Sequence, residues 1–191
     1  MKKHIALATL LALSANVAFA ADDLAKYKDE SRAIVGPFVQ KLIAENKKAV
    51  MEGGPESAIK VCKDIAPAMA GEVSRMNGLR LTRVSLKVRN PLLGTADAWE
   101  QKTLMEFEKR AAKGESTDKM EAAEIVKEPN GKYFRYMKAI ALQPGCVACH
   151  GKPGDINENV KARLAEDYPH DQATGYEAGQ IRGAVSIKRP L

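Results

Sequence analysis

A five-residue motif, Cys146-Val147-Ala148-Cys149-His150, constrains this chain more than any other feature of its sequence. Two cysteines separated by two residues and followed directly by a histidine are compatible with three kinds of site. These are a redox-active dithiol, half of a zinc site, and the attachment site of a c-type haem. Each site requires different surroundings, so the rest of the sequence must decide between them.

The surroundings of the motif do not favour the first two sites. A thioredoxin-like dithiol requires a βαβ setting, and no parallel βαβ pattern is present. Structural zinc usually needs four ligands, whereas Cys62 and His170 are isolated from the motif and from each other. Haem attachment requires this spacing, because each thiol adds to one porphyrin vinyl group and the adjacent imidazole becomes an axial ligand. The motif therefore favours one covalently attached haem c, held by Cys146 and Cys149, with His150 as an iron ligand.

The N-terminus has the parts of a secretory signal. A cationic start precedes an apolar stretch at residues 5–13, which is too short to span a bilayer, and Ala18-Phe19-Ala20 matches a small-x-small cleavage site. An uncleaved membrane anchor is the alternative, but the apolar stretch is short and the cleavage site is well placed. We expect a signal peptide over residues 1–20, cleavage after Ala20, a periplasmic mature protein and no later membrane span. Export agrees with haem attachment, which follows it.

Length and charge limit the number of domains and the kinds of partner that we expect. The 191-residue chain has a net charge of +6, with lysine and glutamate interspersed along its helical segments. Such mixing is typical of a solvated face, although a mild positive balance can assist docking to acidic redox partners. No basic run is interleaved with aromatic residues, so we expect no nucleic-acid partner. The mature length suits a single domain over residues 21–191.

Hydrophobic periodicity predicts helices in the first part of the chain. Apolar residues at helical spacing predict a long amphipathic helix over residues 22–51, kinked at Gly36-Pro37. Gly53-Gly54-Pro55 predicts the end of this helix and the start of a second one, which carries Cys62 on its buried face. Alternation over residues 79–89 then predicts a half-buried strand with a cationic outer face.

The second part of the chain mixes helices and strands. Asp97 and Glu100 resemble a capping box that opens a helix closed near Gly114. A turn at residues 128–131 predicts a hairpin whose second strand leads into the motif. A helix over residues 156–164 and a last strand over residues 182–188 follow. Few strands with antiparallel connections, and helices that do not alternate with them, predict an α+β fold with a small antiparallel sheet flanked by helices.

The ligand on the other face of the iron is less constrained by the sequence. The candidates are Cys62, His170 and the six methionines of the expected mature chain. Methionines on helical stripes, such as Met69 and Met76, are typical of core filling, and His170 lies in a polar, turn-like stretch typical of the surface. Cys62 has two interpretations. It can be a small buried hydrophobic residue, or it can bind iron as a thiolate, which would explain an unpaired cysteine in an oxidising compartment. The residues alone leave both open.

Two further groups of side chains could contact a haem. The basic residues Arg83, Lys87 and Arg89 could pair with its propionates, although basic residues on an exposed strand face are usually solvated. The aromatic residues Tyr133, Phe134 and Tyr136 could pack on the porphyrin, and ordinary core packing is an equal alternative.

Four blocks of the sequence, in order, resemble a known family. They are AIKVCKDIAPAMA around Cys62, RVSLKVRNP with the following Trp99-Glu100, CVACHGKP, and the C-terminal YPHDQATGYEAGQIRGAVSIKRPL. The chain resembles the exported mono-haem proteins long catalogued as a domain of unknown function. The resemblance implies a PAS-like fold, thioether bonds at Cys146 and Cys149, and axial ligation by His150 and Cys62. Residues 92–96 lack an asparagine typical of the family, and Gln180 replaces an acidic residue.

The expected ligand set points to electron transfer. Imidazole and thiolate together would leave no open coordination position, and anionic sulfur favours ferric iron, so the potential should be low. We expect a periplasmic one-electron carrier with a redox partner protein. The alternative is a haem-based redox or gas (NO/CO) sensor that acts through a separate partner. An enzyme such as a peroxidase is less favoured, because no histidine is placed as a distal acid/base group.

Overall fold

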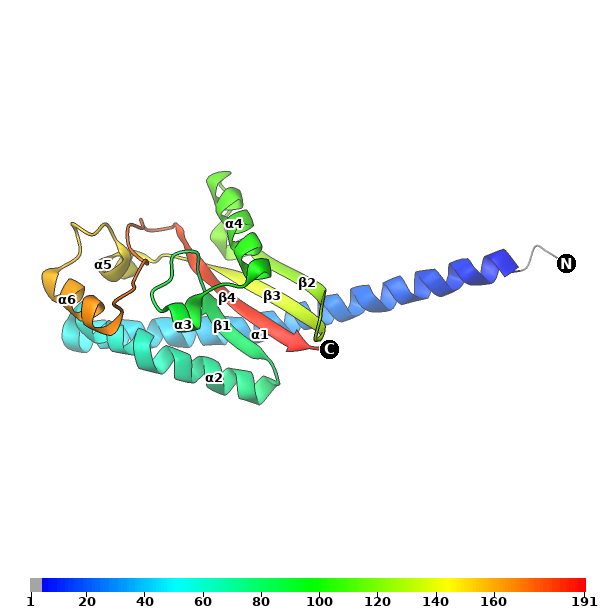
Figure 1. Ribbon diagram of the computed structural model, residues 1–191, viewed down its shortest axis with the longest axis horizontal. Helices are drawn as coiled ribbons and strands as arrows, with labels where there is room; N and C mark the ends of the chain where they lie inside the picture. The colour runs from blue at the N-terminus through cyan, green and yellow to red at the C-terminus, as the bar shows by residue number, and fades with distance from the viewer. Residues whose placement is uncertain (1–4) are drawn as a thin grey trace.

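The computed structural model describes the backbone of residues 5–191 and the side chains of residues 23–191. One four-stranded antiparallel sheet, in the order β1-β4-β3-β2, lies at its centre. Its strands are β1 Arg80–Val84, β2 Glu121–Glu128, β3 Gly131–Ala141 and β4 Ile181–Pro190. The α-helices are α1 Ile5–Lys60, α2 Ala66–Asn77, α3 Pro91–Gly94, α4 Ala98–Ala112, α5 Val147–His150 and α6 Glu158–Asp167. This arrangement (Figure 1) confirms the predicted α+β fold with a long N-terminal helix.

Each face of the sheet has its own hydrophobic core. On one face Phe134 and Tyr136 of β3 and Val185 and Ile187 of β4 pack against α1 and α2. On the other face the alternate residues of the same strands, such as Met137, pack against α4. Because successive strand residues point to opposite faces, one strand contributes to both cores. Phe134 and Tyr136 are therefore core residues, which decides between the two interpretations of these aromatic side chains.

The long N-terminal helix is interrupted later than the sequence predicts. The backbone angles stay helical through Gly36-Pro37, and the non-helical residues are Gly53 and Gly54. Gly54 has φ of +77°, a value that favours glycine. After this break the chain continues into η1, a π-helical turn at Val61–Ile65, and then into α2. The predicted break at Gly53-Gly54 is thus confirmed, and the π-helical turn is new.

Strand β1 is shorter than the predicted strand over residues 79–89. It ends at Val84, and Ser85 instead forms an isolated parallel bridge with Thr95. The Ser85 hydroxyl donates to the Lys87 carbonyl (3.0 Å) and accepts from its amide (3.2 Å), which folds the chain away from the sheet. The alternation of residues 85–89 therefore belongs to a loop, which places Arg89 in the interior.

Other local signals are confirmed. The Asp97 carboxylate accepts from the Glu100 amide (2.9 Å), and the Glu100 carboxylate accepts from the Asp97 amide (2.8 Å), so the capping box is complete. Strands β2 and β3 form the predicted hairpin, and β4 is the predicted last strand. The predicted signal peptide, residues 1–20, lies outside the residues whose side chains are described. Among the described residues, no helix has the length and apolar character of a membrane span.

Glu121 of β2 ties α1 to the edge of the sheet and should make folding pH-dependent. Burial raises the pKa of its carboxyl group, but hydrogen bonds from Arg32, Lys28 and Tyr136 outweigh burial and lower this pKa from 4.5 to about 2. A lowered folded-state pKa contributes stability above the unfolded value, and this stability is lost as pH falls from 4.5 toward 2.

We therefore expect Glu121→Gln to lose less unfolding free energy than the parent protein between pH 5 and about pH 2. Urea titrations at several pH values measure this difference. Glu106→Gln, at an exposed position of α4, is the control and should follow the parent. Parallel losses in the parent and in Glu121→Gln would contradict the expectation.

Candidate functional site

The motif forms one compact turn at the end of β3. Leu142 is hydrogen-bonded to the β4 side of the sheet, since its amide donates to the Gln180 carbonyl (2.8 Å) and its carbonyl accepts from the Gly179 amide (2.8 Å). The chain then forms η3, a 3₁₀ turn at Pro144–Cys146, and continues into α5. A Cβ at Gly151 would lie 2.7 Å from the Val147 carbonyl oxygen, so only glycine fits where α5 ends. Both thiols and the imidazole therefore lie on less than two turns of chain.

One ring nitrogen of His150 forms a hydrogen bond within the protein. Its Nδ1 atom lies 2.6 Å from the carbonyl oxygen of Ala173. A carbonyl oxygen can only accept, so Nδ1 carries the proton and Nε2 keeps a free lone pair. Burial, together with the charges of Arg89 and Arg182, holds the pKa of His150 well below its usual range. The imidazole is neutral at physiological pH and is oriented as in metal-binding histidines, which donate their other N–H group to a carbonyl.

The segment after α6 holds the motif through its backbone. The Gly175 amide donates to the Gly151 carbonyl (2.7 Å), and the Tyr176 amide donates to the His150 carbonyl (3.0 Å). The Tyr176 ring also meets the His150 ring edge-on, with centroids 6.4 Å apart. This segment comes from the C-terminal block that resembles the family, and its role is to fix the position of the imidazole.

Arg89 connects the same segment to the motif. It is 9% exposed, and its Nη2 atom lies 3.0 Å from Asp171 and 2.5 Å from the Cys149 carbonyl oxygen. The interpretation of Arg89 as a solvated strand residue is wrong, because its guanidinium is buried and paired with Asp171. Asp171 in turn accepts from the Ala173 amide (2.8 Å), which places the carbonyl that holds His150.

The thiols of the motif are free and not activated. All three cysteines are unpaired, with Cys146 exposed and Cys149 half-buried. Burial raises the pKa of Cys146, and it raises the pKa of Cys149 to about 11. A catalytic dithiol requires the opposite, a thiol with a lowered pKa. The raised pKa values of both thiols therefore argue against the thioredoxin-like interpretation of the motif.

Cys62 lies near the motif although it is far from it in sequence. Ile59, one turn earlier, packs in a cluster with Ile156 and Leu164 against which Cys149 also lies. The Cys149 sulfur is 3.9 Å from the Pro55 carbonyl oxygen, and a charge on Cys62 contributes to the raised pKa values of both motif thiols. Cys62 itself is half-buried within η1, and its thiol donates to the side-chain oxygen of Asn46 (3.6 Å).

The other ligand candidates differ from Cys62 in their burial. Met69, Met120 and Met137 are buried in the two cores of the sheet, whereas Met51, Met76, Met105 and His170 are exposed. Cys62 is half-buried near the motif.

Comparison with known proteins defines the relationship of this chain. The model of the Tll0287-like family matches residues 9–190. The chain belongs to the Tll0287-like family. The crystal structure of the cyanobacterial haem-protein Tll0287 superposes with a TM-score of 0.63 at 24% sequence identity, over 85% of this chain and 96% of that chain. At this identity the likeness concerns the fold. No curated protein sequence matches the chain significantly.

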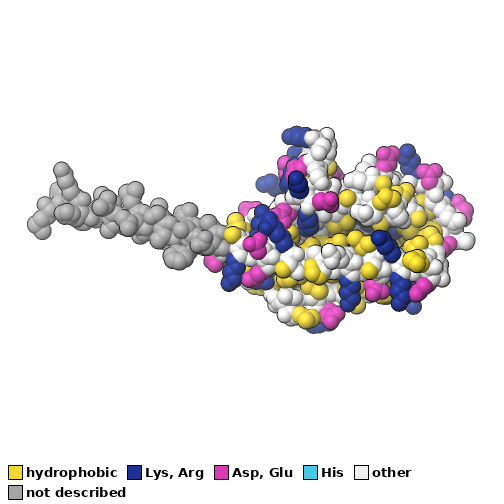
Figure 2. All heavy atoms as spheres, turned by 180° about the vertical axis from the view of Figure 1, so that it is seen from behind, with side chains coloured by type: hydrophobic (Ala, Val, Ile, Leu, Met, Phe, Trp, Pro, Cys, Tyr) yellow, Lys and Arg dark blue, Asp and Glu magenta, His cyan; other side chains and the backbone are white. Residues whose placement is uncertain are grey.

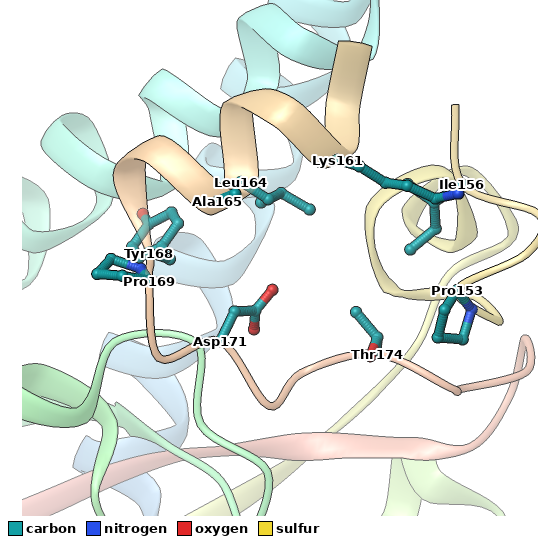
Figure 3. A pocket seen from close by; sticks show the side chains of 9 residues that line it. All are labelled: Pro153, Ile156, Lys161, Leu164, Ala165, Tyr168, Pro169, Asp171 and Thr174. Carbon is teal, nitrogen blue, oxygen red and sulfur yellow. The ribbon is translucent and has the colours of Figure 1, made fainter. Parts of the chain in front are cut away.

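The surface of this Tll0287-like chain is hollowed. An open cleft of about 270 Å³ lies between α6 and the following segment, where Asp171 and Thr174 approach an apolar wall that includes Leu164 and Tyr168 (Figure 3). None of the cysteines lines this cleft, nor does His150. On the face turned away in Figure 1, hydrophobic side chains gather along a hollow (Figure 2).

Three residues that surround His150 in the structure were not predicted from the sequence. Asp171 and Ala173 orient the imidazole, and Arg182 lies beside it. They lie in a loop and at the first positions of β4, where no periodicity or motif distinguishes them. The only available signal is their membership of the C-terminal block that resembles the family.

Proposed function

We propose that this chain is an exported mono-haem c-type cytochrome that transfers single electrons. The observation that carries the proposal is the contact between His150 Nδ1 and the Ala173 carbonyl, because it leaves Nε2 directed away from its hydrogen-bond partner with a free lone pair. An imidazole prepared in this way, next to two free thiols at the Cys-x-x-Cys spacing, fits a covalently attached haem. The relationship to a protein described as a cyanobacterial haem-protein supports the same cofactor.

The donor set fits the two faces of one haem. Cys146 and Cys149 would form the thioether bonds, His150 would bind iron from α5, and Cys62 would bind it from η1. When bound, the haem supplies a one-electron couple whose potential thiolate ligation lowers. The protein contributes the orientation of the imidazole through Ala173, and the position of Cys62 through the packing of Ile59 against α6. Two protein ligands leave no position for a substrate, which favours electron transfer.

The site of action follows from the same chemistry. Covalent attachment to thiols takes place after export, so we propose a periplasmic mature protein released after Ala20. Its partner would be a redox protein that exchanges one electron with it. Cys146 is exposed and marks the edge at which such a partner would approach.

Mass spectrometry and absorption spectra of the purified protein test this proposal. The protein should be produced with its signal sequence in a host that matures c-type cytochromes. We expect a mass equal to that of the chain from residue 21 plus one haem. After reduction, the protein should show the absorption bands of a ferrous c-type haem. A colourless product with the mass of the bare chain would overturn the proposal.

Replacing Cys62 tests the second ligand. We expect Cys62→Ala to keep the covalent haem and to lose the low-spin ferric electron paramagnetic resonance signal of thiolate ligation, because Cys146 and Cys149 hold the group independently. His170→Ala is the matched control at an exposed alternative ligand and should keep this signal. An unchanged spectrum in Cys62→Ala would remove Cys62 from the ligand set.

The π-helical turn at Val61–Ile65 favours a second candidate, a sensor of redox state or of gases such as NO and CO. Single π-helical turns inside α-helices are frequent at functional sites, and this one carries Cys62. Release of the thiolate on reduction would let the turn change its winding and move α2. Rapid carbon monoxide binding by the ferrous protein would support the sensor, whereas no binding would support the carrier.

A further inference from the structure

Arg182 lies directly behind the imidazole of His150. Its Nε atom is 3.3 Å from His150 Nδ1, which is the ring nitrogen that would not bind the iron. Because Nδ1 already carries the proton that it donates to Ala173, this contact brings a cation next to the ring without a second hydrogen bond. The side chain is only partly exposed, and burial lowers the pKa of Arg182, although arginine stays charged at neutral pH.

The charge of Arg182 is not neutralised by the protein. Its Nη1 atom donates to the Ser85 hydroxyl (2.8 Å) and to the Lys87 carbonyl (3.1 Å), and its guanidinium lies over the Tyr176 ring (5.6 Å). All three partners are neutral. Within the described residues no carboxylate lies within ion-pair distance of Arg182, in contrast to Arg89, which pairs with Asp171.

The end of the sheet determines where this cation lies. β4 pairs with β1 as far as Ala184, which lies opposite Val84. The residue before it in the chain, Gly183, has φ of +157°, and a Cβ atom there would lie 2.3 Å from the Val84 carbonyl oxygen, so a larger residue does not fit. The close approach directs the preceding residue, Arg182, toward the loop at Ser85 and toward His150. Its position therefore depends on backbone geometry as well as on its own contacts.

From this arrangement we propose that Arg182 raises the reduction potential of the iron centre through its charge beside His150. The inference rests on the proposed haem function. Reduction transfers one electron from a donor to the iron, so the centre loses one positive charge, and a nearby cation in a medium of low dielectric constant favours that state. Arg182 thus opposes the effect of the Cys62 thiolate, which favours ferric iron.

The test is the midpoint potential of variants, measured by spectroelectrochemistry. We expect Arg182→Gln to lower it, so that the ferrous-to-ferric ratio at the parent midpoint falls about tenfold, equivalent to about 59 mV for one electron. Arg182→Met, which keeps an unbranched stem over Tyr176, should give the same shift, and Arg182→Lys should restore much of the potential. Arg80→Gln removes the same charge at an exposed position at the far end of β1 and is the control.

The outcomes separate this inference from the proposed function. Potentials of Arg182→Gln and Arg182→Met equal to that of Arg80→Gln, with haem attached, would overturn the role of Arg182 and leave the haem proposal intact. Absence of haem from the parent protein would overturn the haem proposal itself.

If both neutral variants fail to fold, Lys87→Glu introduces a carboxylate at an exposed position over the same Tyr176 ring. An unchanged potential in that variant overturns the inference, and a lowered one supports it.

Discussion

Replacing Cys146 and Cys149 together by serine is expected to remove covalent haem from the protein completely. Serine hydroxyls do not add to the vinyl groups of the porphyrin, so the product should have the mass of the bare mature chain. Denaturing electrophoresis followed by haem staining measures the loss directly. Because Cys146 is exposed and Cys149 is only half-buried, we expect the fold to persist, with the change confined to the cofactor.

Single variants refine this prediction. Either Cys146→Ser or Cys149→Ser should retain at most one thioether bond, whereas Cys62→Ser should retain both. The last variant is the matched control, since it also removes one thiol near the same site. Covalent haem in the double variant, or its loss in Cys62→Ser, would contradict the assignment of the two attachment cysteines.

Arg135→Met is expected to destabilise the protein by about 3–5 kcal/mol, the range for breaking a buried ion pair from one side. Arg135 of β3 is 2% exposed, and its guanidinium lies 2.6 Å from Asp97, 3.4 Å from Glu100 and 3.1 Å from Glu128. Methionine would leave the carboxylate of Glu100, itself 3% exposed, buried without a cation. Urea denaturation at neutral pH, analysed as the change in unfolding free energy, measures the effect.

Arg163→Met on α6 is the control for this stability measurement. Arg163 also contacts two acidic residues, Glu166 and Asp167, but its own side chain is 44% exposed, and Asp167 keeps Lys63 as a second partner, so we expect a loss of about 0–1 kcal/mol. Arg135 lies on the face of the sheet that packs against α4, away from the motif. Arg135→Met should therefore keep its covalent haem, and an equal loss of stability in both variants would contradict the special role of the buried cluster.

Local signals in the sequence were sufficient for much of the fold. The capping box at Asp97 and Glu100 and the β2–β3 hairpin depend on residues close together in the chain, and both are confirmed. The alternation up to Arg89 was misleading, because the same pattern continues from β1 into a loop. Periodicity reports which residues alternate in polarity, and it carries no information about where the hydrogen bonds of a strand end.

Some features of the candidate site follow from the sequence, and others depend on the tertiary structure. The spacing of Cys146, Cys149 and His150 is a covalent property of the chain, so the sequence alone determined that two thiols and an imidazole lie close together along the chain. Tertiary structure alone decided that Ala173 accepts from His150, that Arg89 donates to the Cys149 carbonyl, that Arg182 lies beside the ring, and that Cys62 lies near the motif. These interactions join residues 23 to 87 positions apart and result from the packing of β4, α6 and the end of α1. Burial and hydrogen bonding of such distant segments are properties of the whole fold, and no local pattern encodes them.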